Sequence, residues 1–165
     1  MSATRHMTTT ETRDSSFIAK RVFNAPPQLV FDAYTQPEHI RNWWGMEASA
    51  MLVCDVDLRV GGSYRYATEG DGYEVAFGGE YREITPPARV VHTEFFDVPE
   101  YRDTISIVTV DFTDQGDGTT LMTMTIDYPS AEVMQMVLQT GMAEGMDVSF
   151  DRMEAHLQVM QQGHA

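Results

Sequence analysis

Residues 145–160, GMDVSFDRMEAHLQVM, decide how the rest of this chain is expected to fold. Apolar residues recur there at intervals of 4, 3, 4 and 3, at Met146, Phe150, Met153, Leu157 and Met160. That spacing lays one apolar stripe along one face of an α-helix. Since the stripe needs an apolar surface to cover it, the sequence predicts a long C-terminal helix packed on a sheet.

The surface for that helix is predicted in the preceding residues, where the apolar period changes to two. Alternating apolar and polar residues predict strands at 50–57, 62–69, 73–84, 89–96, 103–113 and 119–128. Glycine, proline and aspartate fill the short connections, which favours antiparallel hairpins. An earlier segment, 16–24, mixes β-branched, aromatic and charged residues and is typical of a partly exposed strand.

Two short helices are predicted between that first strand and the later ones. Pro27 and Pro37 each mark a helix start, because proline is tolerated in the first turn. The first helix is expected at 27–34, and the second is expected to carry Trp43 and Trp44 before Gly45 ends it.

The C-terminal helical region is predicted to begin at Ser130 and to be interrupted once. Serine is a favoured N-cap residue, because its side chain accepts a hydrogen bond from the first turn. Gly141 and Gly145 each cost about 1 kcal/mol relative to alanine inside a helix. A kink or break is therefore expected near residues 139–142.

Length and composition predict one globular domain over residues 16–162. The chain has 165 residues, of which 42% are hydrophobic, enough for a single core. Residues 1–15 are polar and aperiodic and are predicted to form a disordered tail. A net charge of −14 repels phosphate backbones and anionic lipids, so neither nucleic acid nor membrane is expected as a partner.

The cysteine and histidine content and the lack of long apolar stretches exclude several classes of protein. Cys54 is the single cysteine, which excludes an internal disulfide and suits a reducing compartment. No apolar stretch approaches the roughly 20 residues that span a bilayer, and a soluble, cytoplasmic protein is expected. The five histidines show no metal-binding spacing, and no phosphate-binding or nucleophile motif is present. We therefore predict neither a metal nor a cofactor.

Five segments in order resemble one known superfamily: PPQLVFDAYTQPEHIRNWWG (26–45), DLRVGGSYRY (57–66), GGEYREITPPARVVHTE (78–94), GDGTTLMTMTIDYPS (116–130) and GMAEGMDVSFDRMEAHL (141–157). The chain resembles the START-like (SRPBCC) superfamily, in its branch of activator-of-heat-shock-protein-90-ATPase homologues. The resemblance implies an α+β helix-grip (START/Bet v 1-like) fold. In that fold a curved antiparallel sheet of about six to seven strands surrounds the C-terminal helix. It also implies an apolar cavity between sheet and helix and no shared catalytic set.

One predicted strand brings titratable groups onto a face that such a cavity would use. In Val90–Phe96, residues two apart share a face, so His92, Glu94 and Phe96 are expected to project together. A histidine beside a carboxylate acts as a hydrogen-bond donor or as a general base, depending on burial. His92 and Glu94 are the only candidates for catalysis, and the alternatives are contact with a ligand, a pair that points to solvent, or a histidine satisfied within the core.

The other expected cavity residues are aromatic or methionine side chains on predicted inner faces. Methionine is flexible and polarisable, so it either adapts to varied ligands or fills a core. Besides His92, Glu94 and Phe96, the ligand-cavity set comprises Trp44, Tyr64, Tyr66, Phe77, Tyr81, Met122, Met124, Met142 and Met146.

Three functions remain open from the sequence. The leading hypothesis is a non-enzymatic domain that binds a small apolar, amphipathic or aromatic molecule. The first alternative is an enzyme of the polyketide cyclase or aromatase type, with His92 and Glu94 as acid and base. The second is a protein-interaction domain that modulates a chaperone or another partner. A buried, pH-responsive histidine would favour the enzyme, and an exposed apolar patch on the outer sheet face would favour the partner. A homodimer is compatible with all three.

Overall fold

The computed structural model describes residues 5–44, 51–70 and 73–162, which form one antiparallel sheet and four helices. The strands are β1 (Thr9–Arg13), β2 (Ser16–Phe23), β3 (Met51–Val56), β4 (Ser63–Gly70), β5 (Tyr73–Thr85), β6 (Arg89–Phe96), β7 (Ser106–Asp114) and β8 (Thr120–Asp127). The helices are α1 (Pro27–Thr35), α2 (Pro37–Trp43), α3 (Ala131–Leu138) and α4 (Met142–Gln162).

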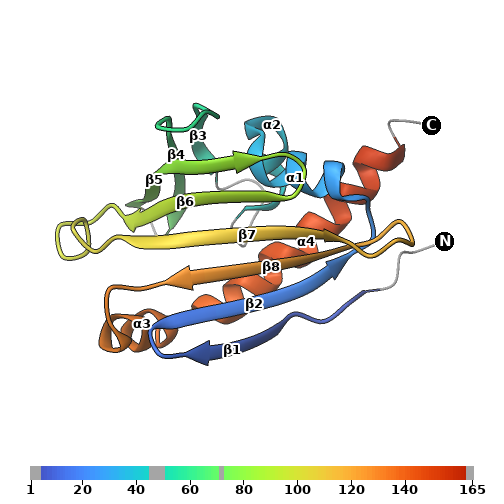
Figure 1. Cartoon of the computed structure of the whole chain (residues 1–165). Coiled ribbons are helices and arrows are strands. Elements are labelled where there is room, and N and C mark those ends of the chain that lie inside the picture. The colour runs from blue at the N-terminus through green and yellow to red at the C-terminus, as the bar shows by residue number, and fades with distance from the viewer. Residues whose placement is uncertain (1–4, 45–50, 71–72, 163–165) are drawn as a thin grey trace.

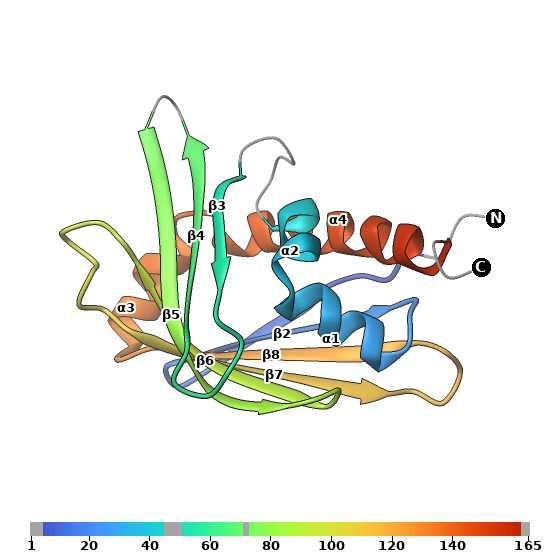
Figure 2. The same ribbon diagram turned by 90° about the horizontal axis from the view of Figure 1, so that it is seen from above.

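The strand order within the described residues is β1-β2-β8-β7-β6-β5-β4-β3, with every neighbouring pair antiparallel (Figure 1). Strands β3, β4 and β5 turn steeply away from β2, β8 and β7, so the sheet is strongly curved (Figure 2). Helices α1, α2 and α4 lie on its concave side. This is the α+β helix-grip fold that the sequence predicts.

The core fills the space between the concave face and α4. Phe150, Met153 and Leu157 of the predicted stripe are at most 2% exposed. They pack with alternate residues of the strands, such as Val110 and Met122, which have no exposed surface. Each fully buried side chain of this size contributes about 1.5–3 kcal/mol of hydrophobic stabilisation. The stripe therefore holds α4 on the sheet as predicted.

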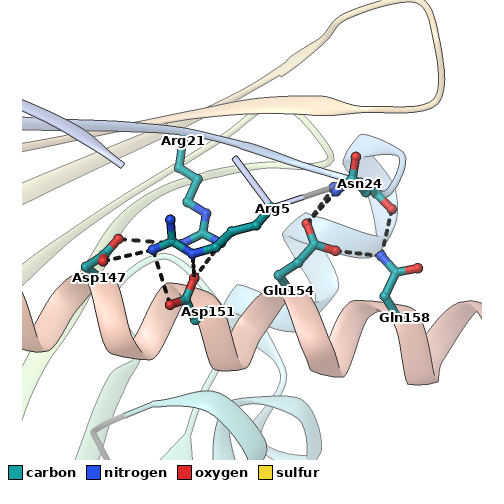
Figure 3. Close-up of polar contacts among 7 residues, drawn as sticks. All are labelled: Arg5, Arg21, Asn24, Asp147, Asp151, Glu154 and Gln158. Carbon is teal, nitrogen blue, oxygen red and sulfur yellow. Dashed lines mark hydrogen bonds and ion pairs between the residues drawn. The ribbon is translucent and has the colours of Figure 1, made fainter. Parts of the chain in front are cut away.

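Polar contacts also fasten α4 to the end of β2 (Figure 3). The backbone N–H of Asn24, just after β2, donates to Oε1 of the buried Glu154 at 2.9 Å. Gln158 donates to Oε2 of Glu154 and to the carbonyl oxygen of Asn24, at 2.5 and 3.1 Å. These bonds set the position of α4 along the strand.

A second polar anchor is Arg21, whose side chain has no exposed surface although it lies between β2 and α4. Its Nη2 is 2.9 Å from Oδ1 of Asp151, and its Nη1 is 3.6 Å from Oδ1 of Asp147. Neither contact is aligned as a hydrogen bond, so both act as ion pairs. Arg5 approaches the same aspartates from outside at 2.9 and 3.1 Å (Figure 3). Two arginines thus share two carboxylates.

The N-terminal segment is where the structure departs from the predicted tail over residues 1–15. Residues Thr9–Arg13 form β1, in register with β2 from Thr9 opposite Lys20 to Arg13 opposite Ser16. All five side chains of β1 are exposed. The strand is therefore held by backbone hydrogen bonds at the sheet edge, which hydrophobic periodicity does not detect.

The other element boundaries lie close to those predicted. The six strands expected after residue 50 are all present, and the helices begin at Pro27 and Pro37 as expected. Ser130 caps α3, its Oγ accepting from the N–H of Val133 at 3.2 Å. The predicted break is confirmed between Leu138 and Met142, where Gly141 has φ +87°. Helix α2 ends at Trp43, and the expected stop at Gly45 lies outside the described residues.

Candidate functional site

His92 is buried on the concave face of β6 and is held by two tyrosines. The hydroxyl of Tyr34, from α1, lies 2.8 Å from Nε2, and the hydroxyl of Tyr64, from β4, lies 2.9 Å from Nδ1. The Tyr64 hydroxyl is also 2.5 Å from the carbonyl oxygen of Thr93. Both ring nitrogens of His92 therefore have protein partners.

One arrangement of protons satisfies all these groups. The carbonyl oxygen of Thr93 only accepts, so Tyr64 donates its proton there and accepts one from Nδ1–H of His92. Tyr34 then donates to the unprotonated Nε2. Burial lowers the pKa of His92 to about 4, which agrees with a neutral imidazole. Burial also raises the pKa of both tyrosines well above 10, so both remain donors.

Gly79 makes room for this contact on the strand between β4 and β6. A Cβ at position 79 would lie 2.7 Å from the Tyr64 hydroxyl and 1.9 Å from the carbonyl oxygen of Thr93. No side chain fits at those distances. The glycine allows Tyr64 to reach across β5 to His92.

Glu94 lies two residues beyond His92 on β6 and is partly buried. Loss of water around its carboxylate raises the pKa of Glu94 to about 7. Within the described part of the chain, this carboxylate has no hydrogen-bond or ion-pair partner, and none joins it to His92. The predicted pair therefore shares a strand without acting as a hydrogen-bonded acid and base.

A continuous row of aromatic rings crosses the same face from the buried core to the surface. Successive ring centroids are 4.9 to 6.0 Å apart. The row runs through Tyr64, Tyr66, Trp44, Phe77, Phe96 and Tyr101. Its first two members are buried, the next three are partly exposed and Tyr101 is exposed. We call these six residues the aromatic row.

The predicted cavity residues separate into two groups by burial. Tyr64, Tyr66, Tyr81, His92, Met122 and Met124 are buried in the core. The remaining six keep part of their surface accessible: Trp44, Glu94, Phe77, Phe96, Met142 and Met146. Of these, Trp44, Met142 and Met146 pack against the buried core. The two methionines lie in the first two turns of α4.

Sequence reasoning missed several residues of this region. Tyr34 lies on a helix far from β6 in sequence, and no local pattern pairs it with His92. His39 and His156 form a second unexpected contact, with Nδ1 and Nε2 2.9 Å apart between α2 and α4. The glycine pair Gly78-Gly79 inside a strand was the available signal, because such glycines mark close approach of other groups.

The structure does not confirm the expected cavity between sheet and helix. Two hollows stand out in the described residues: one lies over β1 and β2, and the other lies between α2 and α4 around Asn42 and His156. Neither is lined by the predicted residues. No group of three metal-ligating side chains occurs among the residues described. Likewise, none of the described helices is long and apolar enough to cross a membrane.

The geometry limits the chemistry that His92 performs. A general base needs a free ring nitrogen within reach of the substrate proton. Tyr34 and Tyr64 occupy both nitrogens, so this histidine serves as a neutral connector of α1, β4 and β6. Of the two residues His92 and Glu94, Glu94 is the one whose side-chain oxygens have no hydrogen-bond or ion-pair partner among the described residues.

Fold and site together define the class: a helix-grip domain of the START-like type, with an aromatic inner face beneath its C-terminal helix. The family model described as activator of Hsp90 ATPase homolog 1-like protein matches residues 24–158, and the chain belongs to this family. The comparison with curated proteins finds no match to this sequence.

Solved structures share the same architecture. A protein from Rhodobacter sphaeroides superimposes with a TM-score of 0.82 at 23% identity, covering 92% of this chain and 98% of that one. A protein from Mycobacterium smegmatis gives 0.80 at 27% identity, covering 90% and 95%. A solution structure from Staphylococcus epidermidis gives 0.77 at 25% identity, covering 92% and 94%. The chain thus spans nearly the whole length of each.

Proposed function

We propose that this domain binds a small apolar or amphipathic molecule between the aromatic row and the first turns of α4. The observation that carries this proposal is the uneven burial of the inner face. Phe150, Met153 and Leu157 close the core along the later turns of α4, with at most 2% exposure. Met142 and Met146, in the first turns, stay partly exposed while they pack against the buried core.

The side chains at this end suit a variable apolar ligand. Methionine has three rotatable bonds and fits irregular shapes, and aromatic rings offer broad apolar faces. A ligand would replace contacts that Met142, Met146 and Trp44 each make with the buried core. The required volume comes from rearranged flexible side chains, so a large preformed cavity is not needed.

The two other functions receive less support. For an enzyme, His92 would need a free nitrogen, and both are bonded to tyrosines. For a docking domain, exposed apolar side chains should gather on one face. Those of the described residues are instead spread over the N-terminal segment, β3, two loops, β7 and both C-terminal helices. The buried, unpaired Cys54 fits a reducing compartment, and the proposal places the domain in the cytoplasm.

Fluorescence of N-phenyl-1-naphthylamine, a neutral dye that brightens in apolar surroundings, tests this proposal. We expect saturable binding by the wild type. Met146→Trp should weaken it about tenfold or more, because the larger ring fills the space near the aromatic row. Met136→Trp is the matched control, since Met136 is 47% exposed on α3. Absence of saturable binding by folded wild-type protein, or equal weakening by both substitutions, would overturn the proposal.

A further inference from the structure

From the position of Glu94 beside the aromatic row, we infer that the ligand is an organic ammonium: a protonated amine carried on an aromatic or aliphatic body. This inference rests on the proposed function and adds the charge of the ligand to it. It begins from what surrounds the Glu94 carboxylate.

Glu94 stands between His92 and Phe96 on the concave face of β6. Ser106, its register partner on β7, uses its hydroxyl to donate to the backbone oxygen of Glu94 at 3.3 Å. Arg65 and Arg102 both bind Asp97, three residues further along the chain, at 2.7 Å. The carboxylate thus keeps its acceptor oxygens without a cation or donor among the residues that the structure describes.

An unpaired carboxylate in such a place is costly for the folded protein. A partly buried ionised group loses part of its hydration, and no hydrogen bond from the described residues replaces that loss at Glu94. The loss of water around Glu94 raises its pKa to about 7, so near neutral pH about half the molecules carry the charge. A positively charged ligand group would supply the missing partner.

The aromatic neighbours favour the same kind of ligand. Phe96 follows Glu94 on the same strand face and stacks on Phe77 at 5.1 Å, and Trp44 lies 5.3 Å from Phe77. A cation near such ring faces is attracted by the negative charge distribution of the ring, in addition to the effect of burial. An anionic ligand would meet repulsion from Glu94, and a neutral one would leave the carboxylate unpaired.

Glu94 is also the group that makes such binding depend on pH. Tyr34 from α1, Tyr64 from β4 and Tyr128 after β8 interact electrostatically with Glu94. Burial raises the pKa of all three tyrosines, and they stay neutral. His92, whose pKa lies at about 4, stays neutral above pH 5, and Met142 and Met146 of α4 do not titrate. Between pH 5.5 and 8, Glu94 alone in this group changes charge.

Displacement of N-phenyl-1-naphthylamine by three probes with one ring system tests the inference. The probes are 2-naphthylmethylamine, 2-naphthylmethanol and 2-naphthoate, which are cationic, neutral and anionic at pH 8. We expect the amine to bind at least tenfold more tightly than the alcohol, and 2-naphthoate to bind weakest. Acidification to pH 5.5 should weaken amine binding about thirtyfold, because protons then compete for Glu94.

Two variants separate the outcomes. Glu94→Gln should remove both the preference for the amine over the alcohol and its pH dependence. Glu74→Gln, at an exposed position of β5, should behave as the wild type. Dye binding with no preference for the amine, or with the preference intact in Glu94→Gln, would overturn this inference and leave the proposed function standing. Absence of dye binding by the wild type would instead contradict the proposed function itself.

Discussion

Tyr64 and His92 are joined by a 2.9 Å hydrogen bond that runs from β4 to β6 across the strand between them. That strand, β5, has glycine at the crossing point, and a Cβ there would lie 2.7 Å from the Tyr64 hydroxyl. Tyr34 completes the arrangement from α1. Three segments far apart in sequence are thus connected through one neutral imidazole, which makes the arrangement open to direct tests.

Gly79→Ala should lower the free energy of unfolding by about 2–4 kcal/mol, as overpacking of a close contact does. The new Cβ would meet the carbonyl oxygen of Thr93 at 1.9 Å, so the backbone must move. Gly78→Ala is the matched control, because its closest contacts are 3.2 Å and include the movable ring of Phe95. Urea denaturation measures both. Equal losses for the two glycines would contradict the specific role of position 79.

Tyr64→Phe should cost about 1–2 kcal/mol, since it removes the hydroxyl that bonds both groups and leaves only the 3.1 Å hydrogen bond from Nδ1–H of His92 to the Thr93 carbonyl oxygen. Tyr101→Phe, which removes the hydroxyl of an exposed ring in the same aromatic row, should change stability by less than about 0.5 kcal/mol. Thermal unfolding followed by circular dichroism compares them. A loss in Tyr64→Phe no larger than that in the control would show that the bonded network contributes nothing.

The fold was predictable because its main features depend on local periodicity. The stripe from Met146 to Met160, the alternation in the six later strands and the breaks at proline and glycine are all visible in single segments. Strand β1 lacked such a signal, because its side chains are all exposed and it pairs with β2 through its backbone, while Arg5 and His6 before it contact Asp151 and Asn24. Edge strands of this kind need the neighbouring strand to be known first.

The candidate site was predictable only in part, for a related reason. Shared-face spacing identified His92 and Glu94 and their aromatic neighbours, because that spacing is fixed within one strand. It did not reveal that Tyr34 and Tyr64 bind the histidine, or that Glu94 has no polar partner among the described residues. Those facts depend on how α1 and β4 approach β6 in three dimensions.

Asp151→Asn should destabilise the protein by about 1–3 kcal/mol, because it removes one of the two charges that neutralise the buried Arg21, while Asp147 stays at 3.6 Å. Arg5→Ala should cost no more than about 1 kcal/mol, since the Arg5 side chain is 50% exposed although it contacts the same aspartates. Urea denaturation at low and high salt measures both, and only the Arg5 effect should weaken with salt. A larger loss in Arg5→Ala would identify the N-terminal segment as the main support of α4.

The free energy of unfolding should depend on pH through two residues of β6 whose contributions have opposite signs. The pKa of Glu94 rises from 4.5 to about 7 on folding, so its contribution to stability is present at low pH and is lost as the pH rises through 7. The pKa of His92 falls from 6.5 to about 4, so the unfolded chain binds that proton first and stability is lost as the pH falls below 6.5. Between pH 8 and 5 the two contributions, each about 2 kcal/mol, nearly cancel.

In Glu94→Gln, the loss of stability that His92 causes below pH 6.5 should therefore become measurable. Relative to the wild type, this variant should be more stable at pH 8, where it removes an unpaired carboxylate, and should lose about 2 kcal/mol of that advantage by pH 5. Glu74→Gln, at an exposed site, should track the wild type at every pH. Urea denaturation at pH 8, 6.5 and 5 gives the comparison. A constant difference between Glu94→Gln and the wild type across this range would mean that Glu94 titrates as an ordinary solvated carboxylate, and the case for an ammonium partner would lose its electrostatic basis.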